Sequence, residues 1–372
     1  MTVHRVLAID PYHGGSHRAL LDGWIERSRH HITPITLPPY HWKWRMRHAP
    51  VTMQDRLREQ GLDQQSWDAV WCTSMLNLAE FLGLAPHPLR HLPAVAYFHE
   101  NQLAYPVRHS DPRDAHFAII NLTTALAADR VWFNSEHNRD TLLDGLEALL
   151  TKMPDHPLLG ALEQVRAKSE IVPPGIRLVP RRDVPLPGPL RVLWAARWEH
   201  DKGPDAFFQA LFELDRREVP FRLSVLGEQF GEAPEVFGRA RQVLQSHLDH
   251  WGFRANRSDY ETVLQSTDVV VSTAEHEFFG IAILEAVSAG CVPVLPARLA
   301  YPELFAPDFL YDGTTTGLVG RLTQLARLKA AGGRLEPPPI SMVERFSWAN
   351  ASRRMDDLLE ETVRISCEVQ RA

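Results

Sequence analysis

The chain has 372 residues, of which 44% are hydrophobic and 23% are charged, and its formal net charge is −6. This length allows two domains with complete hydrophobic cores. No apolar run approaches the ~20 residues of a membrane span, and the N-terminus lacks a signal-peptide pattern, so we expect a cytoplasmic protein. Because the net charge is negative, the surface as a whole is not suited to bind nucleic acid, and any such binding requires a local basic patch.

The cysteine content argues against a disulfide framework and against a structural zinc site. Cys72, Cys291 and Cys367 are few and widely spaced. We therefore expect all three to serve as small buried hydrophobic residues.

Short apolar segments alternate with amphipathic segments along most of the chain, a pattern typical of doubly wound α/β domains. The expected strands lie at residues 3–9, 69–72, 94–98, 130–133 and 170–172, and then at 191–195, 222–226, 269–272 and 292–295. Two parallel sheets, each with its own helices, are the simplest arrangement of these strands.

A proline-rich stretch at residues 173–189 separates the two groups of strands. Proline continues neither a helix nor a central strand, so we place a domain boundary there. We expect an N-terminal domain of residues 1–175 and a C-terminal domain of residues 176–346. Ser347 is a suitable N-cap for a terminal helix within residues 347–372.

The first expected strand leads into Asp10-Pro-Tyr-His-Gly14-Gly15-Ser-His17. The paired glycines allow backbone N–H groups to approach an anion, although the full dinucleotide-binding fingerprint is absent. His13 and His17 have the spacing of a helical metal pair, but His13 precedes the expected helix. We expect these histidines to contact an acceptor or to support the fold, and we expect no metal.

Residues 40–48 alternate cations with indoles. Trp42, Lys43, Trp44 and Arg45 have a composition suited to phosphate contact combined with base stacking. The alternative is a loop whose tryptophans fill the core while its cations remain in solvent, and composition favours neither. RNA binding would also need further basic surface, which folding would have to assemble from Arg56, Arg58, Arg90, Arg108 and Arg113.

Four polar side chains, His99, Glu100, Asn101 and Gln102, follow the strand expected at residues 94–98. Ligands of open α/β sheets bind beyond the carboxyl ends of the strands, so this cluster predicts a site. His99 would bind a sugar hydroxyl, and Glu100 would position an acceptor hydroxyl or fix the histidine tautomer. The alternative is an ordinary turn with Asn101 in a left-handed conformation.

Arg197 and Lys202 flank a loop that follows the strand expected at residues 191–195, and Pro204 suits the first turn of the next helix. Two fixed cations in this place can neutralise the charge that grows on a departing diphosphate. Surface salt bridging explains either residue singly, but it does not explain why both lie on the same turn.

Two carboxylates, Glu277 and Glu285, lie eight residues apart around a segment that we expect to be helical from Gly280 to Gly290. If most of this interval is helical, the two acids lie within about a quarter turn of each other and ~12 Å apart along the axis. One ligand can then contact both. The alternative is two solvated acids on a surface helix, but the small residues in this segment favour close packing on a sheet.

Taken together, these residues, with Gly203 and the Cys-Val-Pro-Val segment that ends at Val294, resemble the donor-binding signature of glycosyltransferase family 4. The resemblance implies a GT-B fold, in which two Rossmann-like doubly wound domains face a cleft and a C-terminal helix crosses back to the first domain. It also implies a retaining, metal-independent transfer from a nucleotide sugar, without a cofactor. Arg197 and Lys202 would hold the diphosphate, Glu277 the sugar and Glu285 the ribose.

A narrower resemblance covers most of the N-terminal half. The segments at residues 12–17, 41–45, 97–102 and 133–137 are similar to those of the tRNA-queuosine mannosyltransferase family and its bacterial relatives. This similarity implies GDP-mannose as donor and queuosine in the tRNA anticodon as acceptor. The segment at residues 172–176 instead resembles the general family 4 pattern, which leaves the acceptor open.

The expected enzyme is therefore a glycosyltransferase that moves a hexose from a nucleotide diphosphate to an acceptor. The expected donor contacts are Gly14, Gly15, Arg197, Lys202, Glu277, Phe279, Gly280, Ile281 and Glu285. The expected acceptor contacts are His13, His17, Trp42, Lys43, Trp44, Arg45, His99, Glu100 and Asn101. Arg197, Lys202, Glu277 and His99 are the expected catalytic residues, and stabilisation of the leaving group carries most of the chemistry.

Three alternatives remain open at this stage. The first is a family 4 glycosyltransferase with a different acceptor. The second is a nucleotide-sugar epimerase or a phosphorylase with the same fold. The third is a catalytically idle module that binds RNA or nucleotides. The oligomeric state is not indicated by any pattern in the chain.

Overall fold

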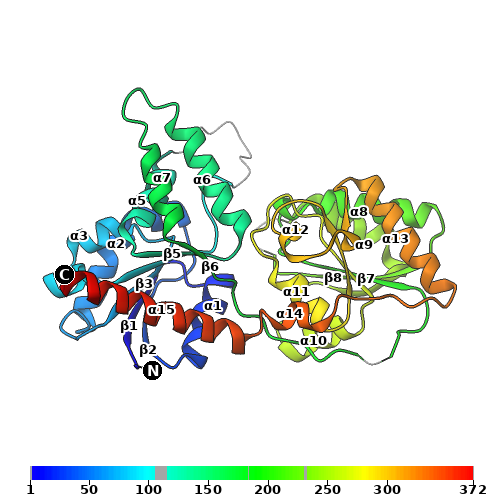
Figure 1. The fold of residues 1–372 in the computed structure, drawn as a ribbon. Helices are drawn as coiled ribbons and strands as arrows, with labels where there is room; N and C mark the ends of the chain where they lie inside the picture. Colours follow the sequence, from blue (N-terminus) through cyan, green and yellow to red (C-terminus); the bar gives the residue numbers. More distant parts are fainter. Residues whose placement is uncertain (1, 105–114, 183, 230–232, 372) are drawn as a thin grey trace. The chain divides into compact units, whose positions relative to one another are not determined.

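The computed structural model describes residues 2–104, 115–182, 184–229 and 233–371 and divides into two compact units (Figure 1). Unit 1 comprises Met1–Gly175 with Trp348–Ala372, and unit 2 comprises Ile176–Ser347. Each unit contains a six-stranded sheet in which all neighbouring strands are parallel. The prediction of two parallel sheets with flanking helices is confirmed.

Unit 1 has the strand order β2-β1-β3-β4-β5-β6. Its strands are β1 (Arg5–Asp10), β2 (His31–Thr36), β3 (Ala69–Thr73), β4 (Ala94–Phe98), β5 (Arg130–Phe133) and β6 (Ser169–Ile171). Its helices are α1 (Gly15–Arg27), α2 (Trp42–Glu59), α3 (Leu78–Leu84), α4 (His87–Arg90), α5 (Ala115–Ala127), α6 (Glu136–Leu150), α7 (Leu159–Ala167) and α15 (Trp348–Arg371).

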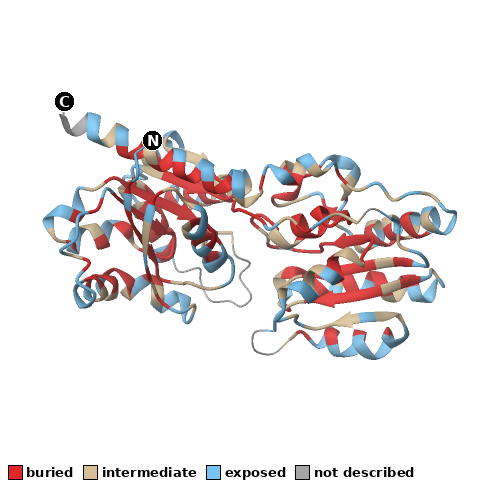
Figure 2. Cartoon of the chain, turned by 90° about the horizontal axis from the view of Figure 1, so that it is seen from below, coloured by how far each residue is buried: buried red, intermediate tan, exposed pale blue. Residues whose placement is uncertain are grey.

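The sheet of unit 1 is covered on both faces because successive strand residues point to opposite sides. Val6 and Ala8 of β1 join a core with Trp24 of α1 and with α15. Leu7 and Ile9 of the same strand join the core formed with α2, α3, α5 and α6. All strands except those at the edges are therefore buried, as Figure 2 shows.

Unit 2 has the strand order β12-β11-β10-β7-β8-β9. Its strands are β7 (Leu190–Ala195), β8 (Phe221–Leu226), β9 (Leu248–Trp251), β10 (Val269–Val271), β11 (Val292–Pro296) and β12 (Leu310–Tyr311). Its α-helices are α8 (Pro204–Arg216), α9 (Glu235–Val243), α10 (Arg257–Gln265), α11 (Ile281–Ser288), α12 (Tyr301–Leu304), α13 (Thr315–Ala330) and α14 (Ile340–Glu344). Short 3₁₀ turns lie at η1 (His200–Lys202), η2 (Gln245–His247) and η3 (Pro307–Phe309).

Alternation also divides the core of unit 2 into two layers. Val192 and Trp194 of β7 pack with Phe207 of α8 and with α9 and α13. Leu193 and Ala195 of the same strand pack with α10, α11, α12 and α14. The small residues of α11 lie directly on this second face, as the sequence indicated.

Each predicted strand is present within two residues of its expected ends, whereas three observed strands were missed. These three, β2, β9 and β12, lie at the edges of their sheets. Their residues are mostly half-buried or exposed, so they lack the apolar run that marks a central strand. Pro34 lies in β2, and an edge strand tolerates proline because one side of its backbone has no strand to pair with.

The cysteine prediction is correct at two positions and wrong at the third. Cys72 and Cys291 are buried, but Cys367 is exposed on α15. No helix in the described part of the chain is long and apolar enough to cross a membrane.

Helix α15 packs in unit 1 against α1, as the resemblance implied. Asp356 of α15 is buried, and its carboxylate accepts hydrogen bonds from three groups at the end of α1. These donors are the indole N–H of Trp24 at 2.7 Å, the hydroxyl of Ser28 at 2.6 Å and the backbone N–H of Arg29 at 2.9 Å. One carboxylate therefore fixes the C-terminal helix to the first helix of the chain.

Replacing Asp356 with alanine should destabilise unit 1 by about 2 to 4 kcal/mol, because three donors lose their acceptor, of which the indole of Trp24 is buried and the other two are half-buried. Urea unfolding followed by tryptophan fluorescence measures this loss. Asp357→Ala is the matched control, since Asp357 pairs with Arg29 at 2.8 Å but is 53% exposed. The control substitution should lower the free energy of unfolding by less than about 1 kcal/mol. Equal unfolding midpoints for the two variants would contradict the role given to Asp356.

Candidate active site

The strand order reverses in both sheets beside the first strand of the unit. In unit 1, β1 lies between β2 and β3, and in unit 2, β7 lies between β8 and β10. At such a switch point the two loops at the carboxyl ends lead to opposite faces of the sheet and leave room for a ligand. The loops after β1, β7 and β10 carry many of the residues that the sequence predicted.

Lys202 is a buried cation at the switch point of unit 2. Its ammonium group donates to the carbonyl of His276 at 2.7 Å and to the carboxylate of Glu277 at 3.4 Å, and it lies 3.4 Å from Asp201. The side chain is 9% exposed, so Lys202 is not a surface salt bridge. The loops after β7 and β10 therefore meet through this one cation.

Gly203 allows this close approach. Its φ of +62° is left-handed, and a Cβ atom there would lie 2.2 Å from the carbonyl oxygen of Thr273. The hydroxyl of Thr273 also donates to the carbonyl of Lys202 at 3.0 Å. Any side chain at residue 203 would push the two loops apart.

Glu277 is held from two sides. One carboxylate oxygen accepts from the backbone N–H groups of Phe278 and Phe279 at 3.1 and 3.3 Å, while the other faces Lys202. Burial alone would raise the pKa of Glu277, but the charge of Lys202 and the bond from Phe279 outweigh it and lower the pKa. Glu277 is thus an ionised acceptor whose side chain is still 27% exposed.

Helix α11 begins at Ile281, so Glu277 lies in the loop before the helix and only Glu285 lies on it. The prediction of a helix that starts after Gly280 is confirmed, whereas residues 277–280 are not helical. Gly280 caps the helix with a φ of +94°, a conformation that turns the chain sharply from the loop into α11. Phe279, Gly280 and Ile281 lie together at the N-terminus of α11, as the predicted donor contacts require.

Glu285 is paired with Arg257, a residue that the sequence analysis did not single out. The guanidinium donates to both carboxylate oxygens, at 2.7 and 3.2 Å. Burial raises the pKa of Glu285, and the bonds from Arg257 offset this only in part. Arg257 also lies over the ring of Tyr260 at 5.0 Å. A ribose at Glu285 would have to share the carboxylate with this guanidinium.

Arg197 differs from Lys202 in burial. Its side chain is 48% exposed, and its guanidinium lies 3.3 Å from Glu199. The salt-bridge explanation therefore describes Arg197 in this structure, while Lys202 is enclosed. Both residues still lie on the loop between β7 and α8, where the sequence placed them.

A buried charge network lies at the switch point of unit 1. His17 of α1 is 3.2 Å from Asp10 through Nδ1 and 3.2 Å from Glu100 through Nε2. Asp10 also accepts from Thr73 at 3.2 Å and lies 3.0 Å from Nδ1 of His13. Asp10 was missed as a site residue, although it is the last residue of β1 and opens the quoted loop.

The pairing sets the protonation of this network. Burial alone would lower the pKa of His17, but Glu100 and Asp10 outweigh it and raise the pKa to about 10. Burial alone would raise the pKa of Asp10, but the charge of His17 and the histidine bonds hold it well below its usual range. Asp10 is therefore ionised and His17 is a cation at neutral pH.

His99 stacks on His17 with ring centroids 3.9 Å apart and lies 4.6 Å from the ring of Tyr97. Burial and the charge of His17 lower the pKa of His99 well below its usual value. Its Nε2 atom is buried and has no hydrogen-bond partner among the described residues. Glu100 contacts Nε2 of His17. It therefore influences the ring of His17, whereas the sequence suggested that it would fix the tautomer of His99.

Asn101 has a structural role in this conformation. It is fully buried, and its amide donates to Asn138 and Thr141 at 3.0 and 3.1 Å. Its carbonyl oxygen accepts from the N–H groups of Leu103 and Ala104. Every side-chain atom that could contact an acceptor is thus engaged, while its φ is not left-handed as the turn interpretation required.

His13 and His17 do not form a helical metal pair, because α1 begins at Gly15 and His13 lies outside it. Gly14 is the N-cap of α1 and is extended, with no side-chain cap. The described residues contain no group of three or more His, Cys, Asp or Glu side chains arranged to hold a metal ion.

The segment at residues 42–47 is the first part of α2 and not a loop. Trp44 is 63% exposed and Trp42 is 37% exposed, so the alternative in which both tryptophans fill the core is wrong. Trp42 packs on Phe117 of α5 with centroids 5.0 Å apart, and Met46 is the buried residue beneath. Arg45 donates to the carbonyl of Pro38 at 2.9 Å.

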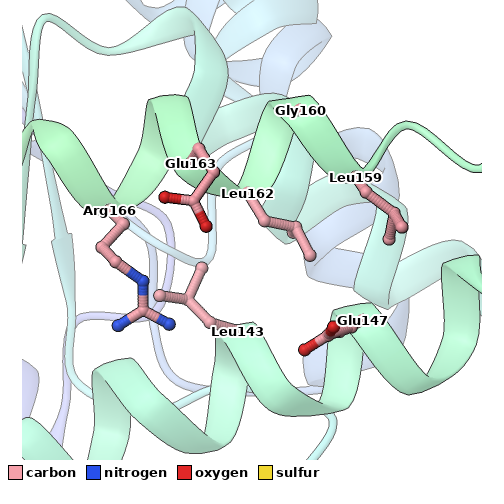
Figure 3. Close-up of a pocket in the computed structure, with 7 residues that line it drawn as sticks. All are labelled: Leu143, Glu147, Leu159, Gly160, Leu162, Glu163 and Arg166. Atoms are coloured by element: carbon pink, nitrogen blue, oxygen red, sulfur yellow. The ribbon is translucent and has the colours of Figure 1, made fainter.

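Two surface hollows in the described part of the chain lie away from these loops. One of about 270 Å³ lies between α6 and α7 (Figure 3), and one of about 480 Å³ lies beside α1 and α15. The first is lined by Leu143, Glu147, Leu159, Gly160, Leu162, Glu163 and Arg166. Neither contains a residue predicted for the site, so we base the site on the strand ends.

The pairing of His17 predicts a pH dependence. NMR of ¹⁵N-labelled histidine should show a protonated His17 and a neutral His99 at pH 8. Because the folded pKa of about 10 lies above the ordinary 6.5, the stabilisation is complete below about pH 6.5 and is lost as the pH rises through 10. The unfolding free energy should fall over this interval. Titration of both rings near pH 6.5 would refute the network.

Two family models match this chain. The N-terminal model of tRNA-queuosine α-mannosyltransferases matches residues 5–176, and the model of group 1 glycosyl transferases matches residues 181–328. The tRNA-queuosine α-mannosyltransferase of Drosophila melanogaster is 34% identical over 335 residues, which cover 87% of each chain. A GDP-mannose-dependent α-(1-6)-phosphatidylinositol dimannoside mannosyltransferase of Mycobacterium tuberculosis is 28% identical over 122 residues, or 33% of this chain and 31% of its own.

The solved structures agree on the fold. Sucrose-phosphate synthase of Thermosynechococcus elongatus superimposes with a TM-score of 0.72 at 14% identity, covering 96% of this chain and 98% of its own. Together the two family models cover residues of both units. The chain belongs to the tRNA-queuosine α-mannosyltransferase family and is a glycosyltransferase of GT-B fold.

Proposed function

We propose that this glycosyltransferase moves mannose from GDP-mannose to queuosine in a tRNA anticodon. The observation that carries the proposal is the match to the Drosophila relative over 87% of the chain, because it includes both units. The GDP-mannose dependence of the mycobacterial relative, which is similar over a third of this chain, supports GDP-mannose as donor.

The donor is bound by unit 2 in this proposal. Lys202 and Arg197 bind the diphosphate, together with the N–H groups at the start of α11, which favour anions. Glu277 accepts from the sugar hydroxyls, and Glu285 accepts from the ribose. The buried pair of Lys202 and Glu277 supports this assignment, since a fixed cation next to a fixed acceptor matches a phosphate next to a sugar.

The acceptor is bound by unit 1, and the Gly14-Gly15 amides add contacts to the diphosphate. In the proposed step the acceptor hydroxyl oxygen bonds to the anomeric carbon as the bond to the β-phosphate oxygen breaks. The hydroxyl proton passes to the departing diphosphate on the same face, so the configuration is retained. No metal is needed because Lys202 and Arg197 take up the developing charge, and neutral His99 binds a sugar hydroxyl through Nε2.

The role of the buried pair is tested by Lys202→Ala and Glu277→Gln. Each should lower kcat for transfer from GDP-mannose by about 100- to 1000-fold, because one preorganised charge or acceptor is lost. Arg334→Ala and Glu336→Gln are matched controls, since these two residues form an ion pair of unit 2 in which both side chains are more than 70% exposed. If Lys202→Ala is folded and turns over the donor at the wild-type rate, the donor assignment is contradicted.

The donor is tested by a thermal-shift screen of GDP-mannose, GDP, UDP-glucose and ADP-glucose. A ligand at 100 times its Kd stabilises by about 2.7 kcal/mol, which corresponds to roughly 5 to 10 °C for a unit of this size. We expect this shift with GDP-mannose and GDP alone. If the melting temperature rises with a UDP or ADP sugar and not with GDP-mannose, the proposed donor is wrong.

A further inference from the structure

The first turns of α2 form a local basic region in an acidic protein. Lys43, Arg45 and Arg47 lie within five residues, and the segment at residues 37–54 contains no Asp or Glu, whereas the chain has a net charge of −6. A local excess of cations is the condition under which an acidic protein can bind a polyanion.

These cations lie at the end of the helix that disfavours them. The N-terminus of a helix carries partial positive charge and favours acids. Here the first turn has no acid, and His41, the N-cap, makes no side-chain cap bond and adopts a left-handed φ of 51°. The helix start therefore carries positive charge that no acid and no side-chain cap offsets, and an anionic partner would offset it.

Aromatic rings lie exposed beside the cations. Tyr40 and Trp44 are each 63% exposed. The ammonium of Lys43 lies 5.8 Å from the ring of Trp42, and the guanidinium of Arg47 lies 4.6 Å from the ring of Phe117 on α5. Large exposed rings next to cations suit the stacking of bases whose phosphates the cations contact. The alternative partner is an acidic protein. Its carboxylates would pair with the cations, but they would not need flat exposed rings.

The region is anchored and adjoins the predicted acceptor loop. Beneath it, Met46 packs with Phe117, Met75 and Ile120, and Tyr12 lies against the same cluster. The ring of Tyr12 is also 5.8 Å from the ring of His17. The basic region thus lies next to the loop after β1, within one unit.

Three of the other arginines considered from the sequence lie in the described part of the chain. Arg56 donates to the carbonyl of Thr36 and lies near Arg45, because its charge adds to burial in lowering the pKa of Arg45. Arg58 pairs with Asp55, and Arg90 donates twice to the carbonyl of Ala85. Arg108 and Arg113 lie outside the described residues.

We propose that the α2 surface, made of Tyr40, Lys43, Trp44 and Arg47, binds unpaired nucleotides of the tRNA that flank the modified one. Trp44 and Tyr40 stack on bases, and Lys43 and Arg47 contact phosphates. Unpaired bases are required because bases stacked in a duplex offer no free face to a side chain. This inference rests on the proposed tRNA acceptor and names the surface that holds it.

The test is the affinity for queuosine-containing tRNA, measured by fluorescence anisotropy at several salt concentrations. Trp44→Ala should weaken binding by about 5- to 150-fold, the loss of one stacked base. Lys43→Ala and Arg47→Ala should each reduce the slope of log affinity against log salt by about 1. Melting temperature and GDP-mannose binding verify that each variant is folded.

Two exposed residues of α2 provide the controls. Val51 is 51% exposed, and Arg58 has a 58% exposed side chain and lies at the far end of the helix. Val51→Ala and Arg58→Ala should bind the tRNA as the wild type does.

The two hypotheses fail in different ways. If the wild-type protein binds tRNA and Trp44→Ala binds it equally well, the α2 surface is overturned while the proposed function stands. A change in self-association with unchanged RNA affinity would likewise overturn it and identify a protein contact. If the wild type neither binds nor modifies queuosine-containing tRNA, the proposed acceptor itself fails.

Discussion

Parallel pairing is the constraint on which the site depends. Because all strands of a sheet run in one direction, their carboxyl ends meet at one edge, and the order reverses beside β1 and β7. In unit 2 this brings the loops after β7 and β10 close enough for Lys202 to contact Glu277. These residues are 75 positions apart in the chain, and only the sheet topology makes them neighbours.

Both units hold paired charges. The pairs differ in how much of each charged group remains exposed. His17 is enclosed between Asp10 and Glu100, so its charge is already satisfied and its main effect is to orient its neighbours and to keep His99 neutral. Glu277 keeps a quarter of its side chain exposed, and Nε2 of His99 has no partner in the described chain. Burying a polar group without a partner costs free energy. The groups left incomplete are therefore the ones suited to contact a ligand.

The sequence predicted the parts of the molecule that depend on local pattern. Central strands carry apolar runs, so their positions were recognised, while the edge strands β2, β9 and β12 carry none. Lys202 was singled out because it follows a buried strand, and Glu277 because it lies eight residues before Glu285. Asp10 and Arg257 were missed since their importance arises from contacts with His17 and Glu285, which only the folded chain creates. The hydrogen bonds of Asn101 were not foreseen for the same reason, as its partners lie on α6.

The fold tolerates extensive change in sequence. A structure at 14% identity shares it, so the arrangement of the parallel sheets persists when most side chains change. The start of α2 is different, because its cations, its uncapped N-terminus and its exposed rings are not required by the fold and each is unfavourable locally. Local features that the fold does not need and that cost stability are candidates for contact with a partner. The choice of acceptor is therefore best sought in unit 1, in the loop after β1 and the helix surface beside it.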